Sequence, residues 1–112
     1  MTLSISQAQD AQIVTVNSER IDASVAIQFK EQMRVETNGG SGRVILDLSN
    51  VSFIDSSGLG AIVASMKQLD ESRRLDLAGL SPTVDKVFRL TRMDTVFNLY
   101  ETLDDAVSAA KN

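Results

Sequence analysis

The sequence predicts a single α/β domain over residues 1–112, with a mixed, mostly parallel sheet that opens with a β-hairpin and carries about four helices. Three observations predict this fold. Short β-branched runs alternate with amphipathic helical periods. The first two such runs are separated by a turn and not by a helix. A chain of 112 residues that is 43% hydrophobic is long enough for one domain with a single core, but too short for two domains. The predicted element order is ββαβαβαβα.

The hairpin is predicted from two stretches in which apolar and polar residues alternate. Leu3 and Ile5 belong to the first stretch, and residues 13–16 form the second. This period of two is typical of strands with one covered face. The intervening Ala-Gln-Asp at 8–10 can turn between them.

The first helix is predicted from apolar side chains that recur every fourth position. These are Ile21, Val25, Phe29 and Met33. Asp22 or Ser24 is the expected N-cap, because both side chains can accept a backbone N–H. The glycine-rich segment 38–42 ends the helix. We interpret that segment as a turn and not as a phosphate loop, because no GxxxxGK[ST] pattern follows.

The run Arg-Val-Ile-Leu-Asp-Leu at 43–48 is typical of a strand buried on both faces, so it is expected at the centre of the sheet. Residues 49–55 then leave the strand. A second helix is expected from Ser56 or Ser57 to about Ser72.

The C-terminal third contains two further strand–helix units. Residues 75–78 form a short strand, after which Ser81 caps a helix that has Pro82 at its first position. A brief strand follows at 98–100. Thr102 is expected to cap the closing helix. The side chains expected on its inner face are Leu103, Ala106, Val107 and Ala110.

The composition excludes several classes of function. The chain has no cysteine and no histidine, which excludes disulfides, thiolate nucleophiles, histidine acid–base chemistry and zinc sites built on those ligands. The net charge of -4 gives no basic field for nucleic acid. Arg73-Arg74 is expected to be a solvated helix end. Without a basic leader or a long apolar run, a cytoplasmic protein away from membranes is expected, and no cofactor is implied.

The segment Asp55-Ser56-Ser57-Gly58-Leu59-Gly60 is the candidate site, because ligands and partners of α/β sheets gather where strands end and helices begin. Steps of about 100° per residue place a large apolar stripe on the core side of the helix. That stripe consists of Leu59, Ile62, Val63, Met66 and Leu69. Ser57 falls opposite. Its expected outer neighbours are Gly60, Ala61, Ala64, Ser65 and Gln68.

An outer face of small residues allows another backbone to approach closely. The alternative is that Asp55 or Ser56 caps the helix and the small residues reflect helix propensity alone. The residues by themselves leave both interpretations open.

Residues 44–60, with the sequence VILDLSNVSFIDSSGLG, resemble the signature of anti-sigma factor antagonists, the single-domain members of the STAS family. The resemblance covers nearly the whole chain and implies one STAS domain over residues 1–112. Residues 20–23 resemble the start of the family's first helix, and residues 80–88 resemble the start of its third. Glu19 departs from the pattern, because the family often has a turn glycine there. That difference puts the local turn, and any partner contact at it, in doubt.

The resemblance implies a partner-switching mechanism. The serine before Gly-Leu-Gly, which is Ser57 here, would be phosphorylated by a partner kinase that doubles as an anti-sigma factor; Ser56 is the neighbour most easily mistaken for it. The unphosphorylated form would bind the kinase and release the kinase's client, and a PP2C-type phosphatase would reset the switch. The expected partner-binding residues are Asp22, Asp55, Ser56, Ser57, Gly58, Gly60, Ala61 and Ala64.

Two other functions are alternatives to partner switching. A STAS-like accessory subunit of a membrane transporter complex would use the same fold without a serine switch. An enzyme with Ser57 as nucleophile and Asp55 as base is disfavoured, because there is no histidine and no Gly-x-Ser-x-Gly elbow. A magnesium site at Asp22 and Asp47 is also disfavoured, because Asp22 is interpreted first as a helix cap and Asp47 as a strand residue.

Overall fold

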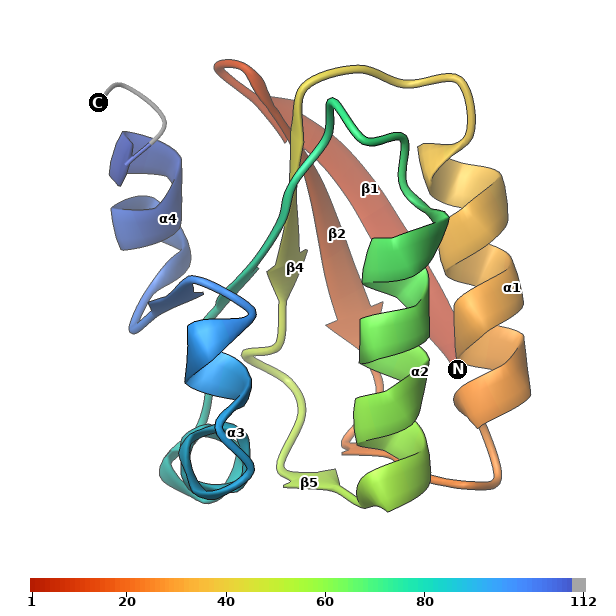
Figure 1. The fold of residues 1–112 in the computed structure, drawn as a ribbon, viewed down its shortest axis with the longest axis vertical. Coiled ribbons are helices and arrows are strands. Elements are labelled where there is room, and N and C mark those ends of the chain that lie inside the picture. The colour runs from red at the N-terminus through yellow and green to blue at the C-terminus, as the bar shows by residue number, and fades with distance from the viewer. Residues whose placement is uncertain (110–112) are drawn as a thin grey trace.

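A computed structural model of the chain describes residues 1–109 and is built around a five-stranded sheet (Figure 1). The strand order is β1-β2-β4-β6-β7. The strands are β1 (Thr2–Ala8), β2 (Ala11–Asn17), β4 (Arg43–Asp47), β6 (Leu75–Ala78) and β7 (Leu99–Tyr100). β1 and β2 pair antiparallel, and the other neighbours pair parallel. The predicted mixed sheet with an opening hairpin is therefore confirmed, and β4 is its central strand.

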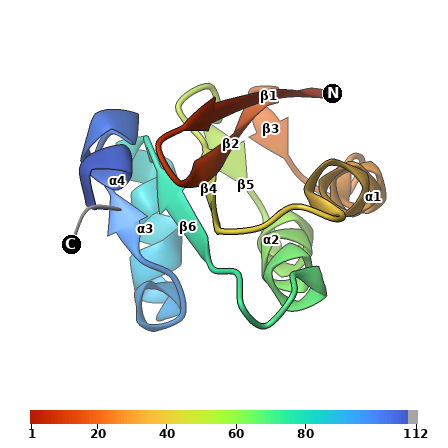
Figure 2. The ribbon, with the colours of Figure 1, turned by 90° about the horizontal axis from the view of Figure 1, so that it is seen from above.

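Four α-helices and one 3-10 turn cover the sheet within residues 1–109. They are α1 (Ala26–Thr37), α2 (Ser56–Gln68), α3 (Pro82–Leu90), the turn η1 (Met93–Thr95) and α4 (Leu103–Ala109). Figure 2 shows α1 and α2 side by side, away from α4. None of these helices has the length and apolar character needed to cross a membrane. The inward position expected for Ala110 lies outside the described residues.

Alternate residues of the strands contribute to two apolar clusters, one on each face of the sheet, as the period of two requires, so the single core expected from the chain length is divided by the sheet. On one face, Val14 and Leu46 join the main core with residues of α1, α2 and α3. On the other face, Ile13 and Ile45 pack with Ala106 of α4. Every residue of β4 is buried, which explains its unbroken apolar run.

A small second sheet, which was not predicted, lies beside the start of α2. Strand β3 (Arg20–Ile21) pairs parallel with β5 (Phe53–Ile54). The expectation that Ile21 belongs to the apolar face of the first helix is wrong, because Ile21 lies in this ladder.

The ends of two helices also differ from expectation. α1 begins at Ala26, and its N-cap Val25 has no side-chain cap bond, so neither Asp22 nor Ser24 caps it. α2 ends at Gln68 and not near Ser72, because the chain turns at 70–72, where Asp70 accepts the Ser72 N–H at 3.0 Å. The caps predicted at Ser81 and Thr102 are confirmed by bonds from the Val84 and Asp105 N–H groups at 3.3 and 3.0 Å.

Arg73 is buried, which corrects the expectation that it is a solvated helix end. Its guanidinium donates to the carbonyl oxygens of Thr37 and Gly42 at 2.7 and 2.8 Å. It also donates to Oε1 of Gln12 at 3.0 Å. Arg73 therefore ties the glycine-rich loop to the sheet. This is a structural role, since its polar groups are held by the chain's own oxygens.

Candidate functional site

Asp55 joins the N-terminus of α2 to the turn that precedes α1. Its Oδ1 accepts the Gly58 N–H at 2.8 Å, and its Oδ2 accepts the Ala23 N–H at 3.1 Å. One carboxylate thus satisfies two backbone donors from distant parts of the chain. The predicted capping role is confirmed. A direct contact between Asp55 and a partner stays a prediction.

Gly58 packs against the backbone of β3. A Cβ atom at Gly58 would lie 1.9 Å from the carbonyl oxygen of Ile21 and 3.0 Å from a side-chain carbon of Ile54. Only a residue without a side chain fits there. Gly58 is buried, and its close packing allows α2 to lie on β3; a contact between Gly58 and a partner stays a prediction.

Ser57 lies exposed on the first turn of α2, next to the exposed Ser56. Gly60 is also exposed, and a Cβ added to it would meet nothing within 4 Å. Ala64 is half-buried one turn further along. Residues three and four apart share a helix face, so Ser57, Gly60 and Ala64 form a continuous strip, which we call the small-residue strip.

Ala61 and Ser65 lie inside the protein, with exposed fractions of 3% and 2%, so their expected place on the outer face is wrong. The most buried stripe of α2 is Gly58, Ala61, Ile62 and Ser65. The Ser65 hydroxyl donates to the Ala61 carbonyl at 2.8 Å, which satisfies it in the core. Because α2 contacts α1 as well as the rest of the core, its small residues face inward and allow close helix packing. The larger Leu59 and Met66 sit half-buried at the margin.

The turn at Asp22 lies against the first turn of α2, through the bond between Ala23 and Asp55. Asp22 Oδ1 accepts the Ser24 hydroxyl at 2.6 Å, and its Oδ2 accepts from Arg20 at 3.0 Å. These hydrogen bonds, that from Ser24 foremost, lower the pKa of Asp22 from its ordinary value. Asp22 is therefore held in its ionised form, paired with Arg20, in the turn beside the start of α2.

Exposed apolar side chains flank this end of the domain, and the sequence analysis did not predict them. Phe53 is 37% exposed, and the Arg20 guanidinium carbon stacks 4.2 Å from its ring centre. Ile27, in the first turn of α1, is 79% exposed. Their outward direction can be inferred from their buried neighbours. Phe53 precedes the buried Ile54 on a strand, where successive side chains point to opposite faces, and Ile27 lies about 200° around the helix from the buried Phe29. Both side chains leave apolar surface in contact with solvent.

Glu19 occupies a turn that needs no glycine, because its backbone φ is not positive. Its carbonyl oxygen accepts the N–H groups of Ser52 and Phe53 at 2.8 and 3.2 Å. The difference from the family pattern therefore leaves the local turn intact.

The remaining candidates lie away from Ser57. Asp47 accepts from Thr15 Oγ1 at 3.4 Å and from the Ser49 N–H at 3.1 Å. Asp22 accepts from Ser24 and Arg20, so these two carboxylates have separate partners.

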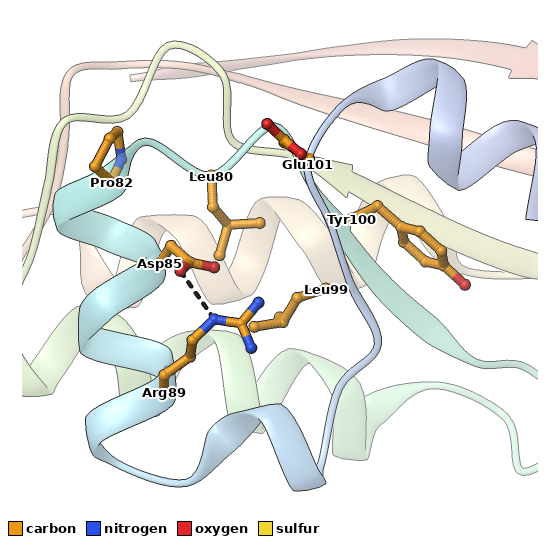
Figure 3. A pocket seen from close by; sticks show the side chains of 7 residues that line it. All are labelled: Leu80, Pro82, Asp85, Arg89, Leu99, Tyr100 and Glu101. Atoms are coloured by element: carbon orange, nitrogen blue, oxygen red, sulfur yellow. Dashed lines mark hydrogen bonds and ion pairs between the residues drawn. The ribbon is translucent and has the colours of Figure 1, made fainter.

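A cavity of about 340 Å³ opens between α3 and β7. Figure 3 shows Leu80 and Leu99 pointing into it and Arg89 bonded to Asp85 at its wall. None of the predicted site residues lines this cavity.

Comparisons with known proteins agree on one family. The family model of the STAS domain matches residues 2–106. A candidate anti-sigma factor antagonist of Thermotoga maritima is 30% identical over 105 residues, which cover 91% of this chain and 92% of that protein. An anti-sigma factor antagonist from Mycobacterium paratuberculosis has a crystal structure with a TM-score of 0.88 and 27% identity, covering 99% of this chain and 94% of that one. The phosphorylated form of the Bacillus cell fate determinant SpoIIAA shares the fold, with a TM-score of 0.67 and 20% identity over 96% of this chain and 98% of that one.

Proposed function

The chain belongs to the STAS domain family, and we propose that it acts as an anti-sigma factor antagonist in a partner-switching pathway. The unphosphorylated chain binds a serine kinase that is also an anti-sigma factor, and so releases the client of that kinase. Phosphorylation of Ser57 blocks binding, and a PP2C-type phosphatase restores it. The chain itself catalyses no reaction and acts in the cytoplasm through protein contacts.

The observation that carries this proposal is the exposed Ser57 hydroxyl at the N-terminus of α2, beside the small-residue strip. A kinase needs an accessible hydroxyl, and a docking partner needs a surface that its backbone can approach closely. Phe53 and Ile27 add apolar contact area at the same end of the domain. The relatives named as antagonists, and the phosphorylated form known for SpoIIAA, support the same assignment.

Phosphorylation would act on the complex more strongly than on the free domain. A phosphate brings about -1.5 to -2 charges to Ser57. Within the domain, the N-terminus of α2 offsets that charge by about 0.3–1 kcal/mol. In a complex, one like-charge pair at about 5 Å costs about 3 kcal/mol at an effective dielectric of about 20. Since about 1.4 kcal/mol corresponds to a factor of ten, binding weakens about a hundredfold or more. No change of shape is required.

The site of modification is tested by incubating the chain with its cognate kinase and mapping the phosphate by mass spectrometry. We expect Ser57→Ala to abolish the modification and Ser56→Ala to leave it unchanged. Modification of Ser57→Ala to the wild-type extent would overturn the assignment.

The partner is tested by comparing pull-downs with wild type and with Ser57→Asp from the source cell. A kinase captured by wild type and lost with Ser57→Asp supports the proposal. Capture of transporter subunits by both forms would instead identify an accessory subunit of a membrane transporter complex.

A further inference from the structure

The edge strand β1 leaves one side of its backbone without a partner strand among the described residues. It stands at the end of the strand order, and β2 pairs with it through all seven of its residues without a bulge. The opposite edge of the sheet, β7, has only two residues. Short strands, bulges, prolines and charged side chains are the usual protection of a sheet edge. β7 is protected by its length, and β1 has none of these devices.

β1 lies in one of several stretches of this acidic chain that carry no charged side chain. Residues 1–9 contain no charged side chain, although the chain as a whole has 15 acidic and 11 basic residues and a net charge of -4. Net charge of one sign opposes the approach of two copies over most of their surface. The side chains of β1 add no charge to this repulsion.

The flank of α1 beside β1 combines polar and apolar side chains with one charged residue, the exposed Glu36. Gln32 donates to the Met1 carbonyl at 3.4 Å, and Gln12 of β2 donates to the Glu36 carbonyl at 2.8 Å, so this flank faces the hairpin. Val35, between these contacts in sequence, is 55% exposed, and Ile5 of β1 is 39% exposed. Apolar side chains are thus available on the helix-covered side of the edge.

We propose that β1 pairs antiparallel with β1 of a second copy of this chain, which joins two sheets into one across a two-fold axis. An uncharged strand paired with itself places no like charges opposite each other. Such an interface is isologous and closes as a dimer. The backbone hydrogen bonds of the shared ladder supply the directional contacts, and Ile5 and Val35 supply apolar area.

The paired edge would leave the candidate site open. Figure 2 shows β1 at the top of the view and α2 in its lower half, and Ser57 lies on α2. A dimer would therefore present two copies of the Ser57 surface. The inference does not depend on the proposed function, because oligomeric state is measured without the kinase.

The dimer is tested by sedimentation velocity over a dilution series. Wild type should dissociate reversibly on dilution. Ile5→Lys and Ser4→Lys introduce facing lysines on opposite faces of β1 and should weaken the dimer about tenfold or more. Ile27→Lys, which places the same charge at an exposed apolar side chain outside β1, is the matched control and should have no effect. Circular dichroism checks that each variant is folded.

Disulfide trapping gives a second measurement, because the chain has no cysteine of its own. The three test variants are Ser4→Cys, Ile5→Cys and Ser6→Cys, each with a single cysteine. The variant whose cysteine lies nearest the two-fold axis should cross-link under mild oxidation, and Ile27→Cys should not. A wild-type chain that is monomeric at every concentration would overturn the proposal. So would a dimer that survives both lysine substitutions in β1, or one that cross-links through Ile27→Cys and not through β1.

Discussion

The α-carbon of Gly58 lies directly on the backbone of Ile21, so close that an added methyl group would stand 1.9 Å from the Ile21 carbonyl oxygen. This contact seats the first turn of α2 on β3. Asp55 holds the same turn by its bonds to Gly58 and Ala23. The place of Ser57 is therefore fixed by backbone contacts on both sides of it in the sequence.

Replacing Gly58 should destabilise the domain, whereas replacing Gly60 should not. Gly58→Ala forces the methyl group into backbone atoms, which we expect to cost about 1–3 kcal/mol of unfolding free energy. Gly60→Ala meets nothing within 4 Å and lies inside α2, so it should stabilise by about 0.5–1 kcal/mol. Urea denaturation of both variants measures the difference. Equal stability of the two would contradict the packing role of Gly58.

Removing the Asp55 carboxylate should cost more than removing an ordinary helix cap. Asp55→Ala leaves two N–H groups without their acceptor, whereas Ser81→Ala at the start of α3 leaves one. We expect a loss of about 1–2 kcal/mol for Asp55→Ala and about 0.5–1 kcal/mol for Ser81→Ala. Amide hydrogen exchange should also speed up at both Gly58 and Ala23 in Asp55→Ala. Faster exchange at Gly58 alone would argue against the tie between the two segments.

The pKa of Asp22 should rise toward its ordinary value of 3.8 when Ser24 is replaced by alanine, because the Ser24 hydrogen bond is the main cause that lowers it. Because the pKa of Asp22 is lower in the folded turn than its ordinary value, ionisation of this carboxyl stabilises the folded state. The stabilisation is complete at neutral pH and is lost as the pH falls through the folded pKa of Asp22. An NMR titration of the carboxyl carbons measures this. Glu31, whose pKa is lowered by Arg34, serves as internal control and should not move.

The buried ion pair beneath α4 should matter far more than an exposed one. Asp76 is fully buried, and its Oδ2 accepts from Nε of Arg43 at 3.1 Å and lies 2.9 Å from Nη2 of the same guanidinium, whose side chain is only 7% exposed. Arg43 also donates to the Ala106 carbonyl at 2.7 Å. Asp76→Asn leaves a buried cation without its counter-charge, and we expect a loss of about 3–5 kcal/mol.

The matched control is Asp85→Asn, which breaks the exposed pair with Arg89 on α3 and should cost about 0.3–0.5 kcal/mol. Thermal and urea unfolding of the two variants give the comparison. A cost for Asp76→Asn no larger than that for Asp85→Asn would show that the pair beneath α4 is not essential to stability.

The main sheet could be predicted because its signals are local. The unbroken apolar run of β4 indicates burial on both faces, and Ser81-Pro82 marks a helix start without reference to the rest of the chain. The pairing of β3 with β5 could not be predicted in the same way, because each strand has only two residues and shows no period. That ladder depends on contacts that form only when the chain has folded.

The sequence predicts where along the chain the candidate site lies, but not how α2 is rotated about its own axis. Periodicity placed the large side chains of α2 toward the core, as is usual for a helix on a sheet. In the structure α2 also packs on α1 and on β3, so Gly58, Ala61 and Ser65 turn inward. Small residues on a helix therefore have two interpretations, a docking face or close packing, and only the neighbouring elements decide between them. Ser57, Gly60 and Ala64 keep the first interpretation.

The central claim is that the phosphate on Ser57 decides whether the partner binds. The most direct test is to titrate the cognate kinase with unphosphorylated wild type and with chain fully phosphorylated at Ser57, by isothermal titration calorimetry, with circular dichroism confirming that both forms are folded. We predict that phosphorylation weakens the affinity about a hundredfold or more. Equal affinity of the two forms would contradict the account.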